Sequence, residues 1–527
     1  AMTAIRHAFE TASVNTHAEL LMTGPGVFSV TSRDTIKSQV SRVSMISIAL
    51  IATLLLLVYR SFSALTLGFL PVISGVLAGI AAVSLGFGEV HGITLGFGTA
   101  LIGEAVDYSI YMFVQSEQGA SQQHWTTQFW PTVRLGVLTS IFGFASLLLS
   151  GFPGLAQLGL YAIAGLVAAA AVTRFVLPHL LPANFKIHDV SPIGRVLSRW
   201  VRHASRLRWA AGLILVGAVA VLAIKHDHLW NNTIASLSPV SPEDVALDAR
   251  LRADMGAPDV RYLVVVSGAD QQTVLRSAEQ VAAVLQTQVD QGELARFESP
   301  SHYLPSITTQ RARQASLPDA PTLQARLTEA VQGLPLRASV LAPFVQDVAA
   351  AKTQPLIRSD DLQHTSMAMA VDGLLIRQAT HWSALLPLTA VPNRDIDAAK
   401  LRAALQATSL PNVLFVDMKA ESDRLYAGYL HEAILLSLGG VLAIVVLLWM
   451  VFRSSRRVLR VTAPLVAAVI TVTAGLALFG QQLIILHLVG LLLVVAVGSN
   501  YALFFDRQDT QTTDIAPRTL ASMLFAN

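Results

Sequence analysis

Long apolar stretches recur along this chain, and they constrain its fold more than any other feature. A helix needs about 20 apolar residues to cross the hydrocarbon core of a bilayer. Stretches near that length lie at 43–59, 62–84, 91–114, 132–150, 155–180, 209–224, 433–452, 461–479 and 482–505, and a tenth begins at about 516. The sequence therefore predicts a polytopic α-helical membrane protein.

Composition agrees with this prediction and excludes several classes of function. Only 13% of the 527 residues are charged, whereas a soluble domain carries about 25%. The net charge of +3 is small, so we expect no nucleic-acid partner. The chain has no cysteine for disulfides or thiolate metal sites. His91 and His487 have no second ligand at zinc-like spacing, so we expect no metal. The sequence contains no Walker A loop, so we do not expect ATP to be the energy source.

A polar block over 225–432 separates two groups of apolar stretches. It contains strand-like runs at 261–268 and 412–418, together with helix-like runs between them. Alternating strands and helices predict an α/β or α+β domain. Lys and Arg are concentrated in the linker 183–208 and in the loop 453–460. The positive-inside rule places these two segments in the cytoplasm and the polar block outside it.

The chain repeats itself with an offset of 393 residues. "YRS" (59–61) matches "FRS" (452–454), Pro71 matches Pro464, and Asp107-Tyr108 matches Asn500-Tyr501. Collinear matches over more than a hundred residues predict two related halves. By this alignment the first half lacks its opening helix and most of its outer domain, and the second half lacks its last helices. We therefore expect the sequence to be part of a longer transporter.

The segment "GEAVDY" (103–108) places two acids near the middle of an apolar stretch. Helical spacing puts Glu104, Asp107 and Tyr108 on one face. Intramembrane acids are costly and usually functional. Burial disfavours the charged form of a carboxyl group, so such a group can take up a proton. The structural alternative is that these side chains only hold helices together, and Asn500 fits that reading equally well.

The paired halves resemble the resistance–nodulation–division (RND) superfamily, and within it the MMPL-type exporters. The resemblance is carried by "YRS" with Pro71, by "HGITLGFGTALIGEAVDY" (91–108) and by "LHLVGLLLVVAVGSNY" (486–501). The first of the two long motifs is similar to exporters associated with aryl-polyene (xanthomonadin-like) pigments and hopanoid-type lipids. The resemblance implies pseudo-two-fold repeated halves, porter-like α/β domains outside the cytoplasm, and proton-driven export of a hydrophobic or amphiphilic molecule.

The resemblance also implies a proton relay at the paired Asp-Tyr positions. Carried over by position, the relay comprises Asp107, Tyr108, Asn500 and Tyr501. Asn500 cannot titrate, so the relay depends on Asp107 together with Glu104. We expect no catalytic residue and no cofactor besides protons as the coupling ion. The sequence assigns no residue to substrate binding.

The resemblance further implies a multi-pass protein of the bacterial cytoplasmic membrane with a large periplasmic domain. The expected partners are a membrane lipid or lipid-like substrate and a periplasmic carrier, and the expected assembly is a monomer or small oligomer. The predicted organisation is the end of a first periplasmic domain (1–42), a first-half bundle (43–182), a cytoplasmic amphipathic linker (183–208), the first helix of the second half (209–224), a second periplasmic domain (225–432) and truncated second-half helices (433–527).

Two other functions remain open at this point. The first is a proton-driven motor or sensor that moves no small molecule. The second is an intramembrane aspartyl protease, which needs two carboxylates facing each other from two helices. The repeat places Asn500 where the second acid would stand, so we favour a secondary active transporter over an enzyme.

Overall fold

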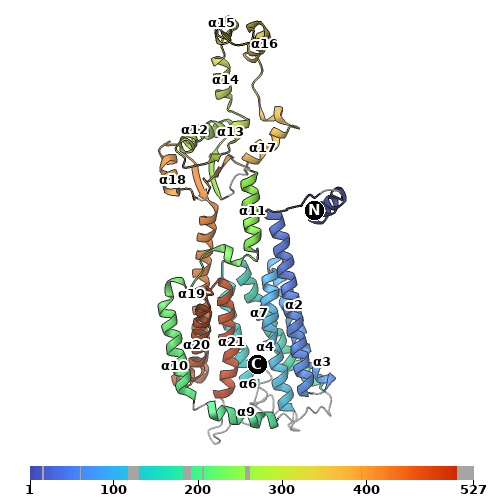
Figure 1. Ribbon diagram of the computed structural model, residues 1–527. Coiled ribbons are helices and arrows are strands. Elements are labelled where there is room, and N and C mark those ends of the chain that lie inside the picture. The colour runs from blue at the N-terminus through green and yellow to red at the C-terminus, as the bar shows by residue number, and fades with distance from the viewer. Residues whose placement is uncertain are drawn as a thin grey trace. The chain divides into compact units, whose positions relative to one another are not determined.

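The protein divides into two compact units (Figure 1). The computed structural model describes residues 1–14, 17–59, 61–116, 130–181, 191–204, 207–255, 261–392 and 394–506. The first unit comprises Ala1–Ser241 and Asp423–Asn527, and the second comprises Pro242–Ser422. The predicted tenth apolar span, from about 516, lies outside the described residues.

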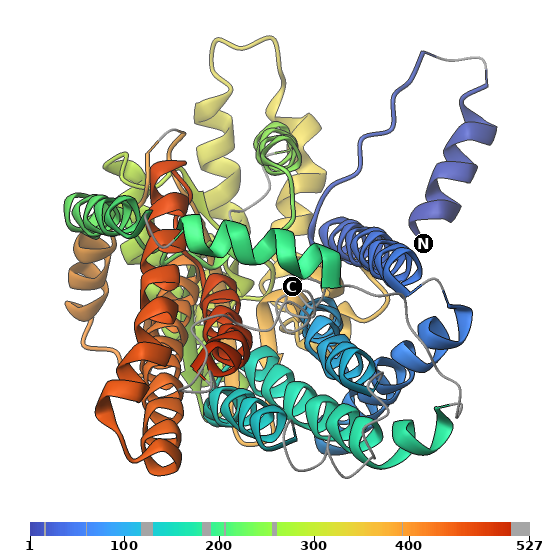
Figure 2. The same ribbon diagram turned by 90° about the horizontal axis from the view of Figure 1, so that it is seen from below.

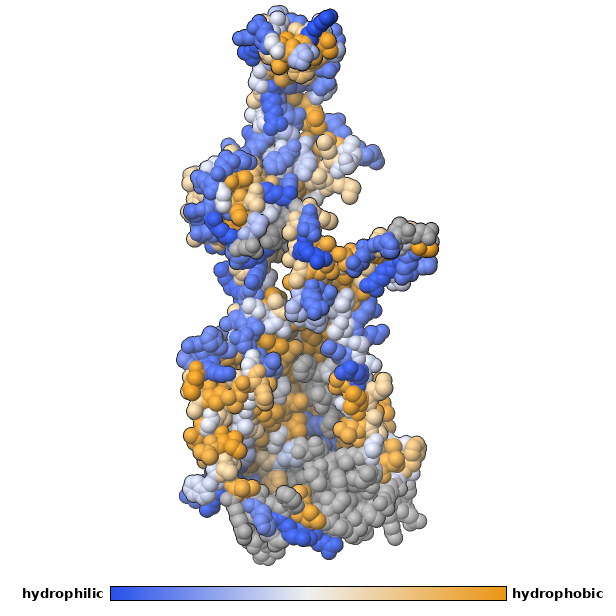
Figure 3. All heavy atoms as spheres, viewed as in Figure 1, coloured by the Kyte–Doolittle hydropathy of each residue, from blue (hydrophilic) through white to orange (hydrophobic). Residues whose placement is uncertain are grey.

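The first unit is a bundle of apolar helices. Its long helices are α2 (Pro25–Tyr59), α3 (Phe62–Phe87), α4 (Gly92–Ser116), α6 (Trp130–Ala145), α7 (Pro153–Ala171), α10 (Arg208–Ile224), α19 (Met418–Phe452), α20 (Ser455–Leu478) and α21 (Ile485–Asp506). Within the described residues, six helical segments are long and apolar enough to cross a membrane. On the face shown in Figure 3, hydrophobic residues cover much of the coloured surface of this unit. The prediction of a polytopic α-helical membrane protein is confirmed.

Shorter elements complete this unit. They are α1 (Met2–Ala12), the 3₁₀ turn η1 (Ser146–Leu149), the π-helical turn η2 (Val172–Val176), α8 (Leu177–Leu180), α9 (Ser191–Ala204), and the 3₁₀ turns η4 (His226–His228) and η5 (Ile234–Leu237). The basic helix α9 lies crosswise at one end of the bundle in both ribbon views (Figures 1 and 2). It belongs to the predicted amphipathic linker.

The helix boundaries repeat with the offset found in the sequence. The pairs α2 and α19, α3 and α20, and α4 and α21 each begin 393 residues apart, and Pro71 and Pro464 both lie inside their helices. Two helices extend beyond the apolar stretches predicted to cross the membrane. The helix that contains 43–59 begins at Pro25, and the helix that contains 433–452 begins at Met418, because an apolar run marks only the part of a helix that lies in hydrocarbon.

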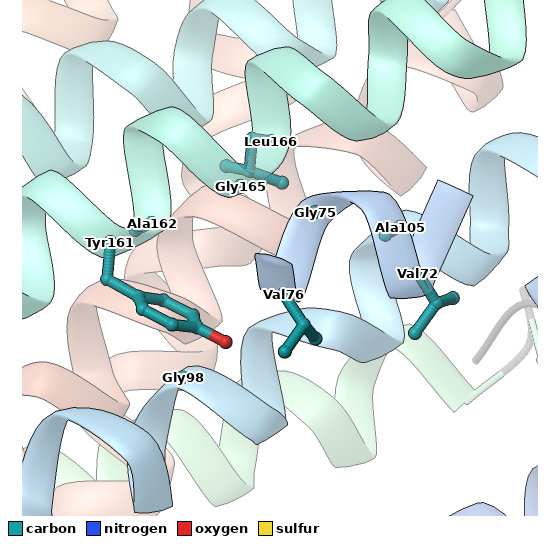
Figure 4. Close-up of a pocket in the computed structure, with 9 residues that line it drawn as sticks. All are labelled: Val72, Gly75, Val76, Gly98, Ala105, Tyr161, Ala162, Gly165 and Leu166. Carbon is teal, nitrogen blue, oxygen red and sulfur yellow. The ribbon is translucent and has the colours of Figure 1, made fainter. Parts of the chain in front are cut away.

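Helices α3, α4 and α7 pack closely because glycines face one another. A Cβ added at Gly75 would lie 2.9 Å from the carbonyl oxygen of Gly165, and one at Gly98 would lie 2.5 Å from the Tyr161 ring. Small residues allow such close backbone approach in membranes. These side chains leave a cavity of only about 20 Å³ (Figure 4). These contacts hold both α3 and α4 against α7.

The second unit is an α/β domain built on an antiparallel sheet. Its strands β1 (Tyr262–Gly268), β2 (Arg296–Phe297), β4 (Trp382–Thr389) and β5 (Val413–Asp417) follow the order β2-β4-β1-β5, and β3 (Leu375–Arg377) also pairs with β4. In the register, Val264 lies opposite Leu386 on β4 and Phe415 on β5. The helices are α11 (Pro242–Asp254), α12 (Gln271–Asp290), α13 (Pro300–Tyr303), α14 (Ile307–Ser316), α15 (Ala320–Ala330), α16 (Ala342–Ala351), α17 (Ser366–Leu374) and α18 (Ala398–Gln406), with 3₁₀ turns η6 (Ala338–Leu341) and η7 (Ser359–Leu362).

The strands expected at 261–268 and 412–418 correspond to β1 and β5. The compact unit is narrower than the predicted domain 225–432, since residues 225–241 and 423–432 group with the membrane helices. Helix α12 covers the sheet with Val274, Leu275 and Ala278, which are fully buried. Composition alone could not place this boundary, because a helix that continues beyond the hydrocarbon has an ordinary polar sequence.

Because glycines of α3 and α7 are in close contact, we expect a larger side chain at this contact to destabilise the protein. We expect Gly75→Ala to lower the free energy of unfolding by about 1–3 kcal/mol, because backbone must move to admit the methyl group. Gly212→Ala on α10 is the matched control, since nothing lies within 4 Å of its added Cβ. Thermal unfolding in detergent measures both variants. An equal melting temperature for Gly75→Ala and Gly212→Ala would contradict the packing described.

Candidate proton site

The predicted acids lie on the buried face of α4. Glu104, Asp107 and Tyr108 are each 2% exposed. The Tyr108 hydroxyl donates to Glu104 Oε1 at 3.1 Å, so the two side chains meet one helical turn apart. An apolar helix thus presents a compact polar face to its neighbours.

Glu104 joins three helices. Its Oε1 accepts hydrogen bonds from Ser140 Oγ on α6 at 2.6 Å and from Asn500 Nδ2 on α21 at 2.8 Å, besides the one from Tyr108. Its Oε2 is buried and has no hydrogen-bond partner among the described residues. One oxygen of the carboxyl group is therefore saturated with donors, while the other is enclosed by apolar packing.

Asp107 reaches the same neighbouring helix. Its Oδ2 accepts a hydrogen bond from the Tyr501 hydroxyl at 3.0 Å. The adjacent residues Asn500 and Tyr501 on α21 thus contact both acids of α4. The structure brings all five residues of the expected relay together, and their role in proton transfer stays a prediction.

The two halves of the internal repeat contribute different kinds of residue to these contacts. Asn500 is the repeat counterpart of Asp107, yet it binds Glu104. Tyr501 is the counterpart of Tyr108, and it binds Asp107. The counterpart of Glu104 is Val497. Both acids of the site therefore come from one half, and the other half supplies donors only.

Helix α6 contributes residues that the sequence analysis missed. Ser140 and Thr139 are fully buried, and the Thr139 hydroxyl lies 2.8 Å from that of Ser499 on α21. Gly136 permits this approach, because a Cβ there would collide with Asn500 Oδ1. The signal in the sequence is a Thr-Ser pair inside an apolar run, one turn after a glycine, which is the composition of a close helix contact.

The side chains that hydrogen-bond to the two acids are uncharged. They are hydroxyl and amide groups, which can bond a carboxyl group in either protonation state. No Lys or Arg side chain in the described ranges hydrogen-bonds to Glu104 or Asp107. A fixed cation would hold a carboxylate ionised, and the described residues place none in hydrogen-bond contact with these acids.

A double-mutant cycle tests the bond between Ser140 and Glu104. We expect Ser140→Ala to lower the free energy of unfolding by about 1–3 kcal/mol, and this loss to shrink in a Glu104→Leu background by a coupling energy of about 0.5–3 kcal/mol. Ser146→Ala serves as the control, because its hydroxyl donates to Gly143 within its own segment. Denaturant unfolding in micelles provides the free energies. Coupling no larger for Ser140 than for Ser146 would contradict the assigned bond.

Comparison with known proteins finds a family model that matches the first part of the chain. No curated protein sequence matches it. Two examples from the solved structures that are similar to it follow. SecDF, a translocon-associated membrane protein from Thermus thermophilus, has a TM-score of 0.43 at 12% identity and covers 92% of this chain and 54% of its own. A heavy metal efflux pump has a TM-score of 0.44 at 13% identity, covering 95% and 62%.

The chain thus spans less than two thirds of either structure's length, and scores at this level carry no conclusion about function. The family comparison is more direct. Residues 1–221, which include the whole of α4 and α6, match the model of the MMPL family. The matched residues are less than half of the 527-residue chain, so the match is a similarity to the MMPL family over its first part.

Proposed function

We propose that this protein is a proton-coupled exporter of a hydrophobic or amphiphilic molecule, and that Glu104 and Asp107 are its proton-binding groups. The observation that carries the proposal is the pair of buried acids on α4, each hydrogen-bonded to α21 of the other half. The match of residues 1–221 to the MMPL family supports a transporter rather than an enzyme. Lipid or aryl-polyene export, a bacterial cytoplasmic membrane and a periplasmic second unit form part of the proposal.

Protonation changes what the site can bond. When Glu104 is ionised, its Oε1 accepts from Ser140, Tyr108 and Asn500. When Glu104 is protonated, its own hydroxyl needs an acceptor, and the amide of Asn500 can supply one by turning its Oδ1 toward the acid. Asp107 and Tyr501 can exchange donor and acceptor roles in the same way. Proton uptake therefore alters the contact between α4 and α21 and can favour one arrangement of the halves.

Helix α19 packs on α6, the helix that donates to Glu104. A Cβ added at Gly440 of α19 would lie 3.0 Å from the Gly143 carbonyl oxygen of α6. Farther along α19, Glu432 Oε1 accepts from the backbone N–H of Gly151, 2.7 Å away. Strand β5 ends at Asp417 and α19 begins at Met418, so no loop separates them. We propose that α19 shifts when the site takes up a proton, and that this shift moves strand β5 of the second unit.

The first test replaces each acid by its amide. We expect Asp107→Asn and Glu104→Gln each to reduce export of the cell's lipid or aryl-polyene product to the level seen with a protonophore, because neither amide titrates. The exposed acids Asp227 and Glu89 provide the matched controls Asp227→Asn and Glu89→Gln. Product in the outer envelope is measured at equal membrane expression. If both site variants export as much product as the wild type, the proton role of the acids is refuted. If a protonophore does not reduce export by the wild type, the coupling of export to protons is refuted.

The second test removes one hydroxyl and keeps its ring. We expect Tyr501→Phe to slow export about tenfold or more, because a hydrogen bond to a charged group contributes about 1.5–3 kcal/mol. Tyr429→Phe is the control, since the Tyr429 ring packs edge-on against Phe152 away from the acids. Initial export rates are compared across pH. Equal rates for Tyr501→Phe and wild type at every pH would show that the bond to Asp107 has no part in transport.

A further inference from the structure

An apolar cavity lies among α19, α20 and α21 in the second half of the bundle. Its volume is about 350 Å³, within the range of about 300–1,000 Å³ typical of small-molecule sites. Aliphatic side chains from all three helices line it, including Leu438, Val469 and Leu492. Ser437 also lines it, with a buried hydroxyl that lacks a hydrogen-bond partner within the described part of the chain. The cavity has the composition of a hydrocarbon-binding site.

A second, polar cavity has a volume of about 550 Å³. Two short segments, around Trp230 and Leu483, contribute residues to the lining of both cavities. The backbone N–H of Leu483 donates to Leu229 at 2.8 Å, and that of Asn231 donates to Leu483 at 2.9 Å. Leu483 and Trp230 line the apolar cavity, whereas the next residue Asn231 lines the polar one. A single ligand that occupied both cavities would have a polar end and an apolar end.

The polar cavity has the charge of an anion site. Its lining includes Lys225 and the imidazoles of His228 and His487, but no Asp or Glu. Lys225 Nζ donates to the Ala477 carbonyl at 2.7 Å, which leaves two of its three N–H donors. His487 Nδ1 accepts from the backbone N–H of Ile484 at 2.9 Å. The neutral ring must therefore carry its proton on Nε2, which is available as a further donor.

We propose that the two cavities form one binding site for an amphiphile with a hydrocarbon chain and an anionic head group. The chain lies among α19, α20 and α21, and the head group accepts hydrogen bonds from Lys225 and His487. A carboxylate or a phosphate would present the same oxygens to these donors. The inference rests on the proposed export function and names the class of molecule exported and where the bundle holds it.

Photolabelling of the purified full chain in nanodiscs tests the site. The probes are palmitic acid with a mid-chain diazirine and the alcohol of the same chain. We expect the acid to label peptides of α19, α20 and α21 that line the cavity, and to label them more strongly than the alcohol does. Lys225→Gln removes the cation and is expected to bring labelling by the acid down to the level of the alcohol. Uniform labelling of lipid-facing peptides in the bundle would overturn the proposal.

Filling the apolar cavity provides the second arm. We expect Val469→Trp to weaken labelling by both probes about tenfold, because the indole occupies the space of the chain. Val472→Trp is the control on the same helix, since Val472 is 44% exposed and lines neither cavity. Mapping of the label on wild type decides the question independently of either variant's folding. Unchanged labelling in Val469→Trp would contradict the assigned position.

The design separates this site from the proton mechanism. Asp107→Asn is expected to keep full labelling, because Asp107 lines neither cavity. If the labelling maps to the cavity while Asp107→Asn exports normally, the proton role fails and the binding site stands. If Asp107→Asn abolishes export while labelling is uniform, the proton role stands and the binding site fails.

Discussion

The arrangement of the bundle depends on keeping two carboxyl groups of α4 satisfied inside an apolar environment. A charged side chain at the centre of a bilayer costs at least about 2.5–3.5 kcal/mol, and each hydrogen bond to a charged group returns about 1.5–3 kcal/mol. Glu104 and Asp107 together accept four such bonds, from Tyr108, Ser140, Asn500 and Tyr501. Three of these donors lie on α6 and α21. The hydrogen bonds to the acids therefore also determine how α6 and α21 are aligned along α4.

The internal repeat gives this site its asymmetry. Helices α4 and α21 begin at matching positions of the two halves, but only α4 contributes acids to the site. A symmetric pair of acids would set like charges against each other across the interface, which disfavours ionising both. Asn500 instead offers a donor or an acceptor without a charge. In the proposed mechanism, Asn500 can therefore bond Glu104 in either protonation state. The cavities proposed to hold an amphiphile lie in the same half of the bundle as Asn500.

Much of the site was predictable from the sequence, because helical spacing is a local pattern and the repeat can be found by comparing the chain with itself. Helical spacing put Glu104, Asp107 and Tyr108 on one face, and the repeat identified Asn500 and Tyr501 as the counterparts of Asp107 and Tyr108. Ser140 and Gly136 were missed because helical Ser and Thr usually bond their own backbone, and periodicity does not say which neighbour a helix faces. The strand order β2-β4-β1-β5 likewise depends on long-range pairing that single runs of residues do not encode.

The central claim is that the acids of α4 bind and release protons while bonded to α21. Infrared difference spectroscopy of the reconstituted protein, stepped between alkaline and acidic pH, tests it most directly. The account predicts carboxylic C=O bands that vanish in Glu104→Gln and Asp107→Asn, with the Glu104 band moving to a new frequency in Asn500→Leu because that variant removes its amide partner. If neither acid gives a band that changes with pH while the protein still exports its substrate, the account is contradicted.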